Sequence, residues 1–309
     1  MVRVVVPTLN AAAIWPRFAA AVTACVAPHQ VLAIDSQSTD GTAELARTSG
    51  FEVHSIPRAE FNHGGTRQKA AEMLPEADIL IYLTQDAVLA SGDSVSRLLA
   101  AFQDPNVAVA YGRQLPREEA NAIEAHARVF NYPDQSNVRD IDARRTLGFK
   151  TIFVSNSFAA YRRGALMQVG GFPRDIIFGE DTVTVAKALL AGYKVAYVAD
   201  ACVYHSHPYR WSQEFKRYFD IGVLHRSESW LLDTFGGAGS EGTRFLVSEL
   251  SYLLRENWPL LPSAMIRSML KYTGYKLGRM ENQLPACAKL RLSMNRSYWG
   301  ASYCDGRRK

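Results

Sequence analysis

Two short polar stretches of the sequence combine residue types that can bind nucleosides and phosphates. The first, Asp35–Thr42, places two carboxylates among hydroxyl side chains, between an apolar segment and a helical one. A carboxylate that follows a strand can accept hydrogen bonds from ribose hydroxyls or a base, and Gly41 permits a tight turn into the helix. An Asx-turn with a helix cap, supplied by Ser38 or Asp40, is the alternative interpretation.

The second stretch, Phe61–Arg67, has the sequence Phe-Asn-His-Gly-Gly-Thr-Arg at the start of a helical segment. Backbone N–H groups at the N-terminus of a helix attract anions, and an arginine matches the geometry of phosphate oxygens. We therefore expect His63, Gly64 and Arg67 to bind a diphosphate. A helix cap with a Gly-Gly turn is the alternative.

Buried strands and helices alternate through the first third of the chain and would position these stretches. Apolar, β-branched segments predict the strands, and helix-like segments lie between them. This alternation implies right-handed βαβ crossovers and a Rossmann-like, mostly parallel sheet with flanking helices. Polar residues follow the strands, where such sheets bind ligands, so one crevice should collect them. The expected strands are Val2–Val6, Val31–Ile34, Phe51–Ile56 and Ile79–Leu83, and the expected helices are Ala12–Cys25, Thr42–Thr48 and Arg67–Leu74.

The second half of the chain is less regular, but no linker rich in Pro, Ser or Gly separates it from the first half. We therefore expect it to extend the same sheet. Beyond His207 the pattern becomes helical, with a helix start at Pro262-Ser263. The expected elements before that point are the strands Val107–Tyr111, Ile152–Ser155 and Val195–Val198 and the helix Glu180–Ala191.

The composition is that of an ordinary folded protein, with 309 residues of which 48% are hydrophobic and 21% are charged. It excludes intrinsic disorder and collagen. Four separated cysteines without a CxxC pair argue against a disulfide framework or a thiolate zinc site, and they favour a reducing cytoplasm. Apolar stretches are too short or interrupted for a membrane span or an export signal. The basic excess lies beyond residue 208, where 16 Lys/Arg accompany 9 Asp/Glu.

Pro7-Thr8-Leu9-Asn10 followed by Asp35–Thr42 resembles the nucleotide-sugar-binding start of family 2 glycosyltransferases with the GT-A fold. The likeness extends through about residues 2–208. Phe61–Arg67 looks specifically like the branch of the family that transfers L-rhamnose from dTDP-L-rhamnose. The resemblance implies that Pro7, Thr8, Asn10, Asp35 and Asp40 line the base and ribose pocket, and we expect Ser38 to bind the nucleotide sugar as well.

The resemblance also implies a metal site. Thr84-Gln85-Asp86 follows an apolar segment at the place where the GT-A fold usually carries Asp-x-Asp, and only the last acid is present. Mg²⁺ or Mn²⁺ needs few protein ligands when a diphosphate and water supply the others. Family members use a histidine near His205 and His207, which alternation along an extended segment places on one side. We expect Asp86 with His207, or else His205, to hold the metal, and Gln85 to approach ribose or sugar; surface histidines are the alternative.

The Glu180-Asp181 pair follows Phe178-Gly179 and begins a predicted helix. Acidic residues in a first helical turn are favoured by the helix dipole alone, which is the structural alternative. The family pattern implies instead that Asp181 removes the proton of the acceptor hydroxyl in an inverting transfer. Glu180 would orient that base or the acceptor.

The stretch Phe153–Arg163 combines strand-like alternation with amides, hydroxyls and arginines, and we interpret it as the acceptor side. Asn156 and Ser157 would bind sugar hydroxyls, and Arg162 would bind a lipid-borne phosphate. Trp211 would stack on a sugar face. A solvated arginine and a core tryptophan are the alternatives.

Together these features predict a metal-dependent GT-A enzyme that transfers L-rhamnose from dTDP-L-rhamnose to a lipid-linked or lipopolysaccharide glycan, as in O-antigen and surface polysaccharide synthesis. Residues 1–208 would form the catalytic domain, with a nucleotide-sugar half up to about residue 112 and an acceptor half after it. Residues 209–309 would form a helical C-terminal extension.

The basic, aromatic extension predicts peripheral attachment to the inner face of the cytoplasmic membrane. A UDP-hexose donor is one alternative, because the metal motif is incomplete. A non-catalytic module that binds a nucleotide or glycan is another, and it is weakened by the presence of both the Glu-Asp pair and the two histidines. No nucleic-acid partner is expected, since the basic region lacks a recognised reader motif.

Overall fold

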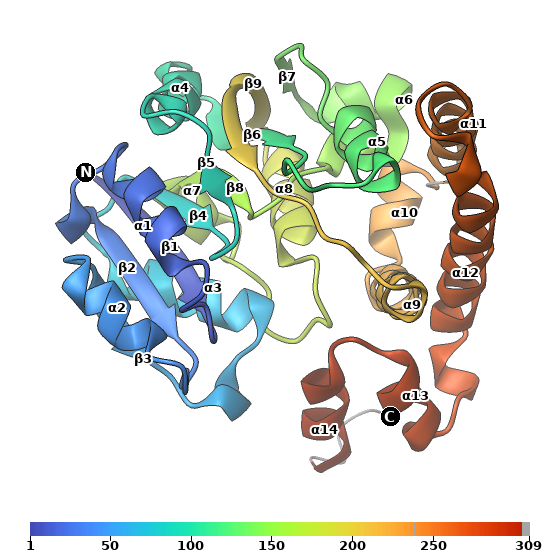
Figure 1. Ribbon diagram of the computed structural model, residues 1–309. Helices are drawn as coiled ribbons and strands as arrows, with labels where there is room; N and C mark the ends of the chain where they lie inside the picture. The colour runs from blue at the N-terminus through green and yellow to red at the C-terminus, as the bar shows by residue number, and fades with distance from the viewer. Residues whose placement is uncertain (238, 305–309) are drawn as a thin grey trace.

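The structure is a computed structural model that describes residues 1–237 and 239–304. Its centre is one mixed sheet of nine strands (Figure 1). Four of them pair in parallel in the order β3-β2-β1-β4, as the alternating pattern predicts. These strands are β1 (Val2–Thr8), β2 (Val31–Asp35), β3 (Glu52–Ser55) and β4 (Ile79–Leu83).

The second half of the chain continues the same sheet beyond β4, as the missing linker predicts. Strand β8 runs antiparallel to both β4 and β6, and β9 runs parallel to β6. Strands β5 and β7 pair antiparallel with β9. The bounds are β5 (Val88–Leu89), β6 (Val107–Leu115), β7 (Asn137–Arg139), β8 (Phe158–Arg162) and β9 (Lys194–Tyr204).

Helices cover both faces of the sheet. Helices α1, α2 and α4 contribute to the core on one face, and α3 and α8 contribute to the core on the other. The α-helices up to the end of β9 are α1 (Trp15–Thr23), α2 (Thr42–Thr48), α3 (His63–Met73), α4 (Ser94–Ala100), α5 (Ala122–Asn131), α6 (Arg144–Leu147), α7 (Arg163–Gln168) and α8 (Glu180–Leu190). Short 3₁₀ turns are η1 (Pro28–Gln30), η2 (Arg58–Glu60), η3 (Ala101–Gln103), η4 (Ile141–Ala143) and η5 (Gly148–Ile152).

Several C-terminal helices share the core of the sheet, whereas Leu253 of α11 and Ala264 of α12 form a small separate cluster with Ile123 of α5. Phe219, Leu231 and Trp299 lie in the same buried cluster as the side chains of α3 and α8. Figure 1 shows α9, α11 and α12 at one end of the sheet, with α13 and α14 below them. The bounds are α9 (Trp211–Ser227), α10 (Trp230–Phe235), α11 (Gly239–Glu256), η6 (Trp258–Leu260), α12 (Leu261–Arg279), η7 (Glu281–Gln283), α13 (Ala286–Leu292) and α14 (Arg296–Cys304). Among the described helices, none has the length and apolarity needed to cross a membrane.

The predicted strand Ile152–Ser155 is wrong. Ile152 ends the turn η5, and the strand in this region is β8, which begins three residues after Ser155. The Arg139 guanidinium donates to the carbonyls of Lys150 and Phe153 at 2.7 and 3.0 Å, so a side chain satisfies these backbone groups where a neighbouring strand would otherwise do so.

Helix α3 begins at His63, four residues before its predicted start at Arg67. Asn62 caps it, since its side-chain oxygen accepts a hydrogen bond from the Gly65 backbone at 2.5 Å. The Gly-Gly pair therefore lies inside the first helical turn. Strands β6 and β9 extend beyond their predicted ends, because the two strands continue to pair with each other as far as Leu115 and Tyr204.

Glycines allow α9 and α12 to pack with their backbones in close contact. A Cβ added to Gly278 would lie 2.0 Å from the Phe219 carbonyl oxygen, and one added to Gly274 would lie 2.4 Å from that of Phe215. Such a clash is with backbone, so it cannot be relieved by rotating a side chain. The two helices would have to separate.

We therefore expect Gly278→Ala to lower the free energy of unfolding by about 1–3 kcal/mol, the usual cost of overpacking. Urea unfolding followed by circular dichroism measures this. Gly164→Ala is the matched control, because Gly164 is also helical and a Cβ there would meet nothing within 4 Å. Equal stability of the two variants would contradict the packing argument.

Candidate active site

The loop after β1 is tied to the loop after β2 by the carboxylate of Asp35. One oxygen of Asp35 accepts hydrogen bonds from the hydroxyls of Thr8 at 3.3 Å and Ser38 at 2.5 Å. The Ser38 hydroxyl in turn accepts from the backbone of Asn10 at 2.9 Å. These residues, which the sequence predicts to bind the nucleotide, therefore meet where the parallel strands β1 and β2 end. Pro7 precedes Thr8 in β1.

Asp40 and Gln85 hold the loop after β1 by hydrogen bonds to its backbone. Asp40 accepts from the backbone of Ala12 at 2.9 Å and from the hydroxyl of Thr42 at 2.5 Å, which matches the alternative interpretation of a capping residue. The Gln85 amide accepts from and donates to the backbone of Leu9, at 2.8 and 3.0 Å. Both polar ends of Gln85 are engaged there, so we leave its expected contact with ribose or sugar out of the proposed site.

Two residues other than glycine in these loops have left-handed backbone conformations. Asn10 has φ of 49° and Gln37 has φ of 57°. Such conformations cost energy and persist only where surrounding contacts impose them. The side-chain oxygen of Asn10 accepts from the Thr39 backbone at 2.9 Å, and that of Gln37 accepts from the Arg58 backbone at 3.1 Å. The loop is therefore held in one shape.

Asp86, His205 and His207 form a cluster whose potential ligand atoms all lie within 4.8 Å of one another. A carboxylate oxygen of Asp86 lies 3.4 Å from Nε2 of His205 and 3.7 Å from Nδ1 of His207. The histidines follow the end of β9, and their rings are 4.5 Å apart. The expected meeting of these three residues is thus observed, although the histidines lie in a loop and not on a strand.

The protonation states of this cluster suit a hard cation. Burial lowers the pKa of His205, and burial together with His205 lowers the pKa of His207 to about 3. Burial raises the pKa of Asp86, but its contacts with His205, His207 and Thr84 outweigh this effect, and the net shift is downward. One carboxylate and two neutral imidazoles therefore face each other, a donor set that fits Mn²⁺ or Mg²⁺ with diphosphate and water as further ligands.

Arg117 adds a positive charge beside Asp86. Its guanidinium donates to the Asp86 carbonyl at 2.7 Å and lies 3.5 Å from the carboxylate. Arg117 is partly exposed, so it can also meet an anion from the crevice. The sequence analysis missed it, although the rule that polar residues follow strands would have found it two residues after β6.

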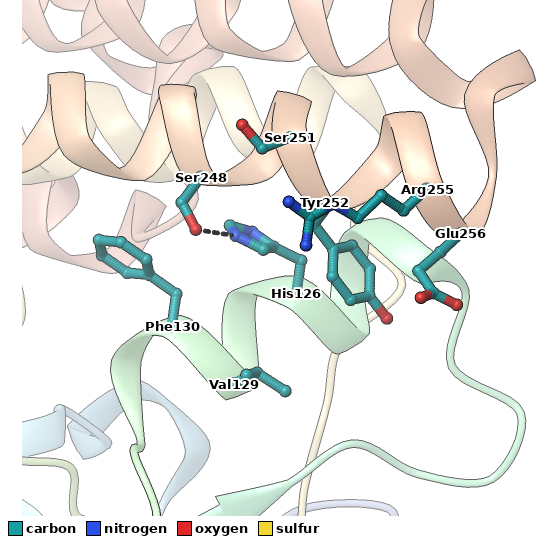
Figure 2. A pocket seen from close by; sticks show the side chains of 8 residues that line it. All are labelled: His126, Val129, Phe130, Ser248, Ser251, Tyr252, Arg255 and Glu256. Atoms are coloured by element: carbon teal, nitrogen blue, oxygen red, sulfur yellow. Dashed lines mark hydrogen bonds between the residues drawn. The ribbon is translucent and has the colours of Figure 1, made fainter.

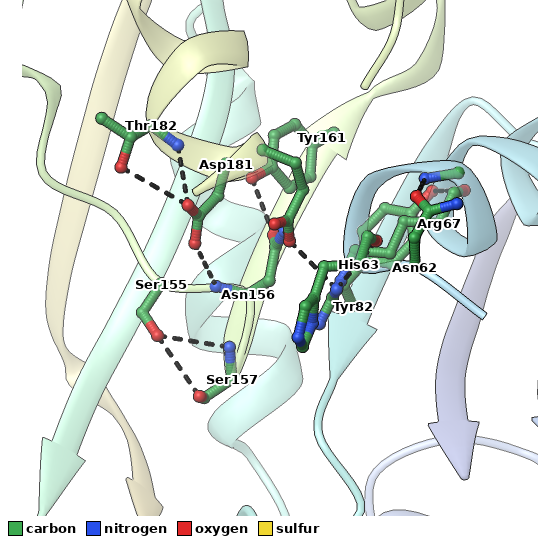
Figure 3. Close-up of polar contacts among 12 residues, drawn as sticks. Asn62, His63, Arg67, Tyr82, Ser155, Asn156, Ser157, Tyr161, Asp181 and Thr182 are labelled. Atoms are coloured by element: carbon green, nitrogen blue, oxygen red, sulfur yellow. Dashed lines mark hydrogen bonds and ion pairs between the residues drawn. The ribbon is translucent and has the colours of Figure 1, made fainter. Parts of the chain in front are cut away.

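The Glu180-Asp181 pair lies in the first turn of α8, and Figure 3 shows Asp181 beside Asn156 and Thr182. Glu180 is buried and accepts from the guanidinium of Arg67 at 3.0 Å and from the amide of Asn156 at 2.9 Å. Asp181 accepts from the backbone of Asn156 at 3.2 Å and of Thr182 at 2.7 Å. The first carboxylate is neutralised by an ion pair, whereas the second has only neutral donors.

This difference separates the two pKa values. Burial raises the pKa of Glu180, but the charges of Arg67 and His63 lower it, and the net shift is downward. Burial, followed by the charge of Glu180, raises the pKa of Asp181 to about 6. A carboxylate that titrates near neutral pH is suited to accept a proton, so the arrangement favours Asp181 as a general base.

A family model, glycosyl transferase family group 2, matches residues 79–288. The chain belongs to this glycosyltransferase family. It is 43% identical over 300 residues to the O-antigen chain rhamnosyltransferase RfbN of Salmonella typhimurium, covering 96% of each chain. It is 44% identical over 297 residues to the O-antigen chain rhamnosyltransferase WbaN of Salmonella anatum, covering 96% of this chain and 94% of the other.

Solved structures show the same GT-A fold. The mannosyltransferase PcManGT from Pyrobaculum calidifontis, in complex with GDP-Man and Mn²⁺, aligns with a TM-score of 0.57 at 18% identity, over 99% of this chain and 88% of its own. S. aureus TarS 1–349 aligns with a TM-score of 0.54 at 15% identity, over 99% and 92%. The predicted fold class and family are confirmed.

Arg67 of this glycosyltransferase does not lie where the sequence analysis expected. It is 4% exposed, and its guanidinium donates to Glu180 and to the His63 carbonyl. We therefore leave it out of the diphosphate site. The close packing of α3 brings it to Glu180, since a Cβ on Gly64 would lie 1.8 Å from the Pro173 carbonyl oxygen. His63 lies at the start of this helix. Burial lowers its pKa, while the charge of Glu180 and a side-chain hydrogen bond with Asn295 of the C-terminal region oppose this shift.

The predicted acceptor residues of the glycosyltransferase lie in three different places: before β8, at the end of β8 and at the start of α9. The Asn156 backbone contacts Asp181, but its side chain holds Glu180 and accepts from Tyr161 at 2.7 Å, and Ser157 contacts Ser155. Arg162 pairs with Ile79 at the start of β4, the opposite edge of the sheet, and binds backbone carbonyls there. We leave Arg162 out of the acceptor site. Trp211 begins α9 and is 45% exposed.

Because a base must be unprotonated to act, we expect kcat/KM to fall about tenfold per pH unit below about 6 and to level off above it. Asp181→Asn should lower kcat by a factor on the order of 10³ while the far-ultraviolet circular dichroism stays unchanged. Asp142→Asn, the same change at an exposed site, is the control. A pH profile that is flat between 5 and 8 would contradict this assignment.

Proposed function

We propose that the enzyme is an inverting rhamnosyltransferase that moves L-rhamnose from dTDP-L-rhamnose to a glycan acceptor that is lipid-linked or part of lipopolysaccharide. The names of the two Salmonella relatives support the sugar and the acceptor class, at an identity that extends over nearly the whole chain. The observation that carries the proposed chemistry is the contrast between ionised Glu180 and titratable Asp181.

Asp181 would accept the proton of an acceptor hydroxyl, and the resulting oxygen would attack the anomeric carbon of the donor. The bond from that carbon to the diphosphate oxygen breaks, and dTDP leaves with the bonding electrons. Inversion from a β-linked donor gives an α-rhamnoside. Arg117 and the N-terminus of α3 would stabilise the charge that develops on the diphosphate. A divalent cation held by Asp86, His205 and His207 would supply further neutralisation of that charge.

The donor is tested by thermal unfolding of Asp181→Asn, which should bind substrates without consuming them. With Mn²⁺ present, we expect dTDP-L-rhamnose at a hundred times its Kd to stabilise the protein by about 2.7 kcal/mol. UDP-glucose at the same concentration should stabilise it less. Preference for a UDP-hexose would contradict the proposed donor. A wild-type enzyme that binds dTDP-L-rhamnose but releases no dTDP with a glycan acceptor would indicate a binding module.

We also propose that the enzyme works in the cytoplasm, attached peripherally to the inner face of the membrane that carries its acceptor. Large apolar side chains repeat at helical spacing along α11, η6 and α12, and each is at least 58% exposed. They are accompanied by the basic excess of this part of the chain. Apolar side chains entering the interface and lysines or arginines near anionic lipid are the usual components of reversible attachment. The apolar residues are Val247, Leu254, Trp258, Met265, Met269 and Tyr272.

Sedimentation with vesicles that contain phosphatidylglycerol tests the attachment. We expect binding that weakens as salt increases, and we expect Leu254→Ser to reduce it several-fold, because a buried leucine contributes about 2 kcal/mol. Leu190→Ser is the control, since Leu190 is a similarly exposed leucine on α8. If both variants bind like the wild-type enzyme, the proposed surface is wrong.

A further inference from the structure

The side chain of Gln114 contacts both the metal cluster and the segment that precedes β8. It is near the end of β6 and only 2% exposed. Its side-chain oxygen lies 2.9 Å from Nδ1 of His205 and also accepts a hydrogen bond from the guanidinium of Arg128. Its side-chain nitrogen donates to the hydroxyl of Ser155 at 2.9 Å. Neither the sequence motifs nor the reaction described above uses this residue.

Arg128 fixes which way the Gln114 amide points. A guanidinium can only donate hydrogen bonds, so the amide oxygen, not the NH₂ group, must face it. The same oxygen lies against Nδ1 of His205, so this nitrogen must carry the hydrogen. An imidazole that binds a metal is neutral and has one hydrogen, so in this form Nε2 of His205 is left with its lone pair directed toward Asp86, 3.4 Å away.

Two electron-rich atoms at this distance repel each other unless a cation or a proton lies between them. The orientation of Gln114 thus prepares Nε2 of His205 as a metal ligand in the cluster with Asp86 and His207. Partners behind a ligating histidine commonly fix its tautomer in this way, and their loss costs 10–100-fold in metal affinity.

The other end of Gln114 leads to the base. Ser155 precedes Asn156, whose backbone donates to Asp181 at 3.2 Å. The hydrogen bonds of Gln114 and the backbone from Ser155 to Asn156 therefore connect the metal cluster with Asp181.

Arg128 is itself held by the C-terminal region through α5. His126 of α5 hydrogen-bonds Ser248 of α11 at 2.9 Å (Figure 2). The rings of Phe130 and Phe245 are 5.1 Å apart. These contacts lie on the turns of α5 next to Arg128. The extension beyond residue 208 thus supports the helix that orients Gln114.

We propose that Gln114 is a positioning residue that sets the tautomer of His205 and thereby the affinity of the enzyme for Mn²⁺, an inference that rests on the proposed metal-assisted transfer. Gln114→Met keeps the size of the side chain but removes the oxygen that faces Nδ1. Gln114→Glu keeps an oxygen for both Arg128 and His205. The two variants therefore separate the hydrogen-bond acceptor from the volume of the side chain.

Mn²⁺ binding to the full-length protein without nucleotide is measured by the electron paramagnetic resonance signal of the free ion. We expect Gln114→Met to weaken binding 10–100-fold and Gln114→Glu to remain within a few-fold of the wild-type affinity. Gln68→Met is the matched control, because Gln68 is also a buried, hydrogen-bonded amide but contacts Glu72 and Phe172 instead of the cluster.

The tautomer is read directly from the ¹⁵N shifts of His205, assigned by comparison with His205→Asn. The expected wild-type signal has hydrogen on Nδ1, and Gln114→Met should lose this preference. Wild-type affinity and an unchanged tautomer in Gln114→Met would overturn the inference and leave the proposed function standing. Absence of Mn²⁺ binding by the wild-type protein would overturn the metal site itself and, with it, this role of Gln114.

Discussion

The buried ion pair between Arg67 and Glu180 determines how α3 packs against α8. It joins α3, which follows the nucleotide loops, to α8, which carries the acidic pair, and both side chains are about 95% buried. An unpaired charge at such a site would be strongly destabilising, so each residue requires the other. The ion pair therefore fixes the position of α3, in the first half of the chain, relative to α8 in the second half.

This ion pair also sets the chemistry of the neighbouring carboxylate. Because Arg67 keeps Glu180 ionised, Asp181 experiences a permanent negative charge next to it, in addition to its own burial. The higher pKa of Asp181 is thus due first to burial and second to the charge of Glu180, which Arg67 keeps in place. Two adjacent acids thus take different roles because one has a cationic partner and the other has backbone donors.

Much of the first half of the fold could be predicted from the sequence, because each buried parallel strand is a short β-branched run followed by polar residues. The strand Ile79–Leu83 and the helix Thr42–Thr48 have the predicted bounds. The second half could not be predicted as well. Its strand β8 is inserted antiparallel between β4 and β6, and the segment before it is held by Arg139, a partner at a distance that no local pattern reveals.

The residues of the candidate site could likewise be predicted only in part, because their roles depend on contacts with distant parts of the chain. Local patterns identified polar residues at the ends of strands and the start of a helix, such as Asp35, Asp86 and Asp181, but they did not separate side chains that are free to face a ligand from those that hold the loops. Asp40, Gln85 and Arg67 fall in the second class, since their polar atoms already have protein partners. A sequence motif indicates that a particular side chain is required at a position. Which role it has depends on whether the fold supplies it with a partner, and that partner can lie anywhere in the chain.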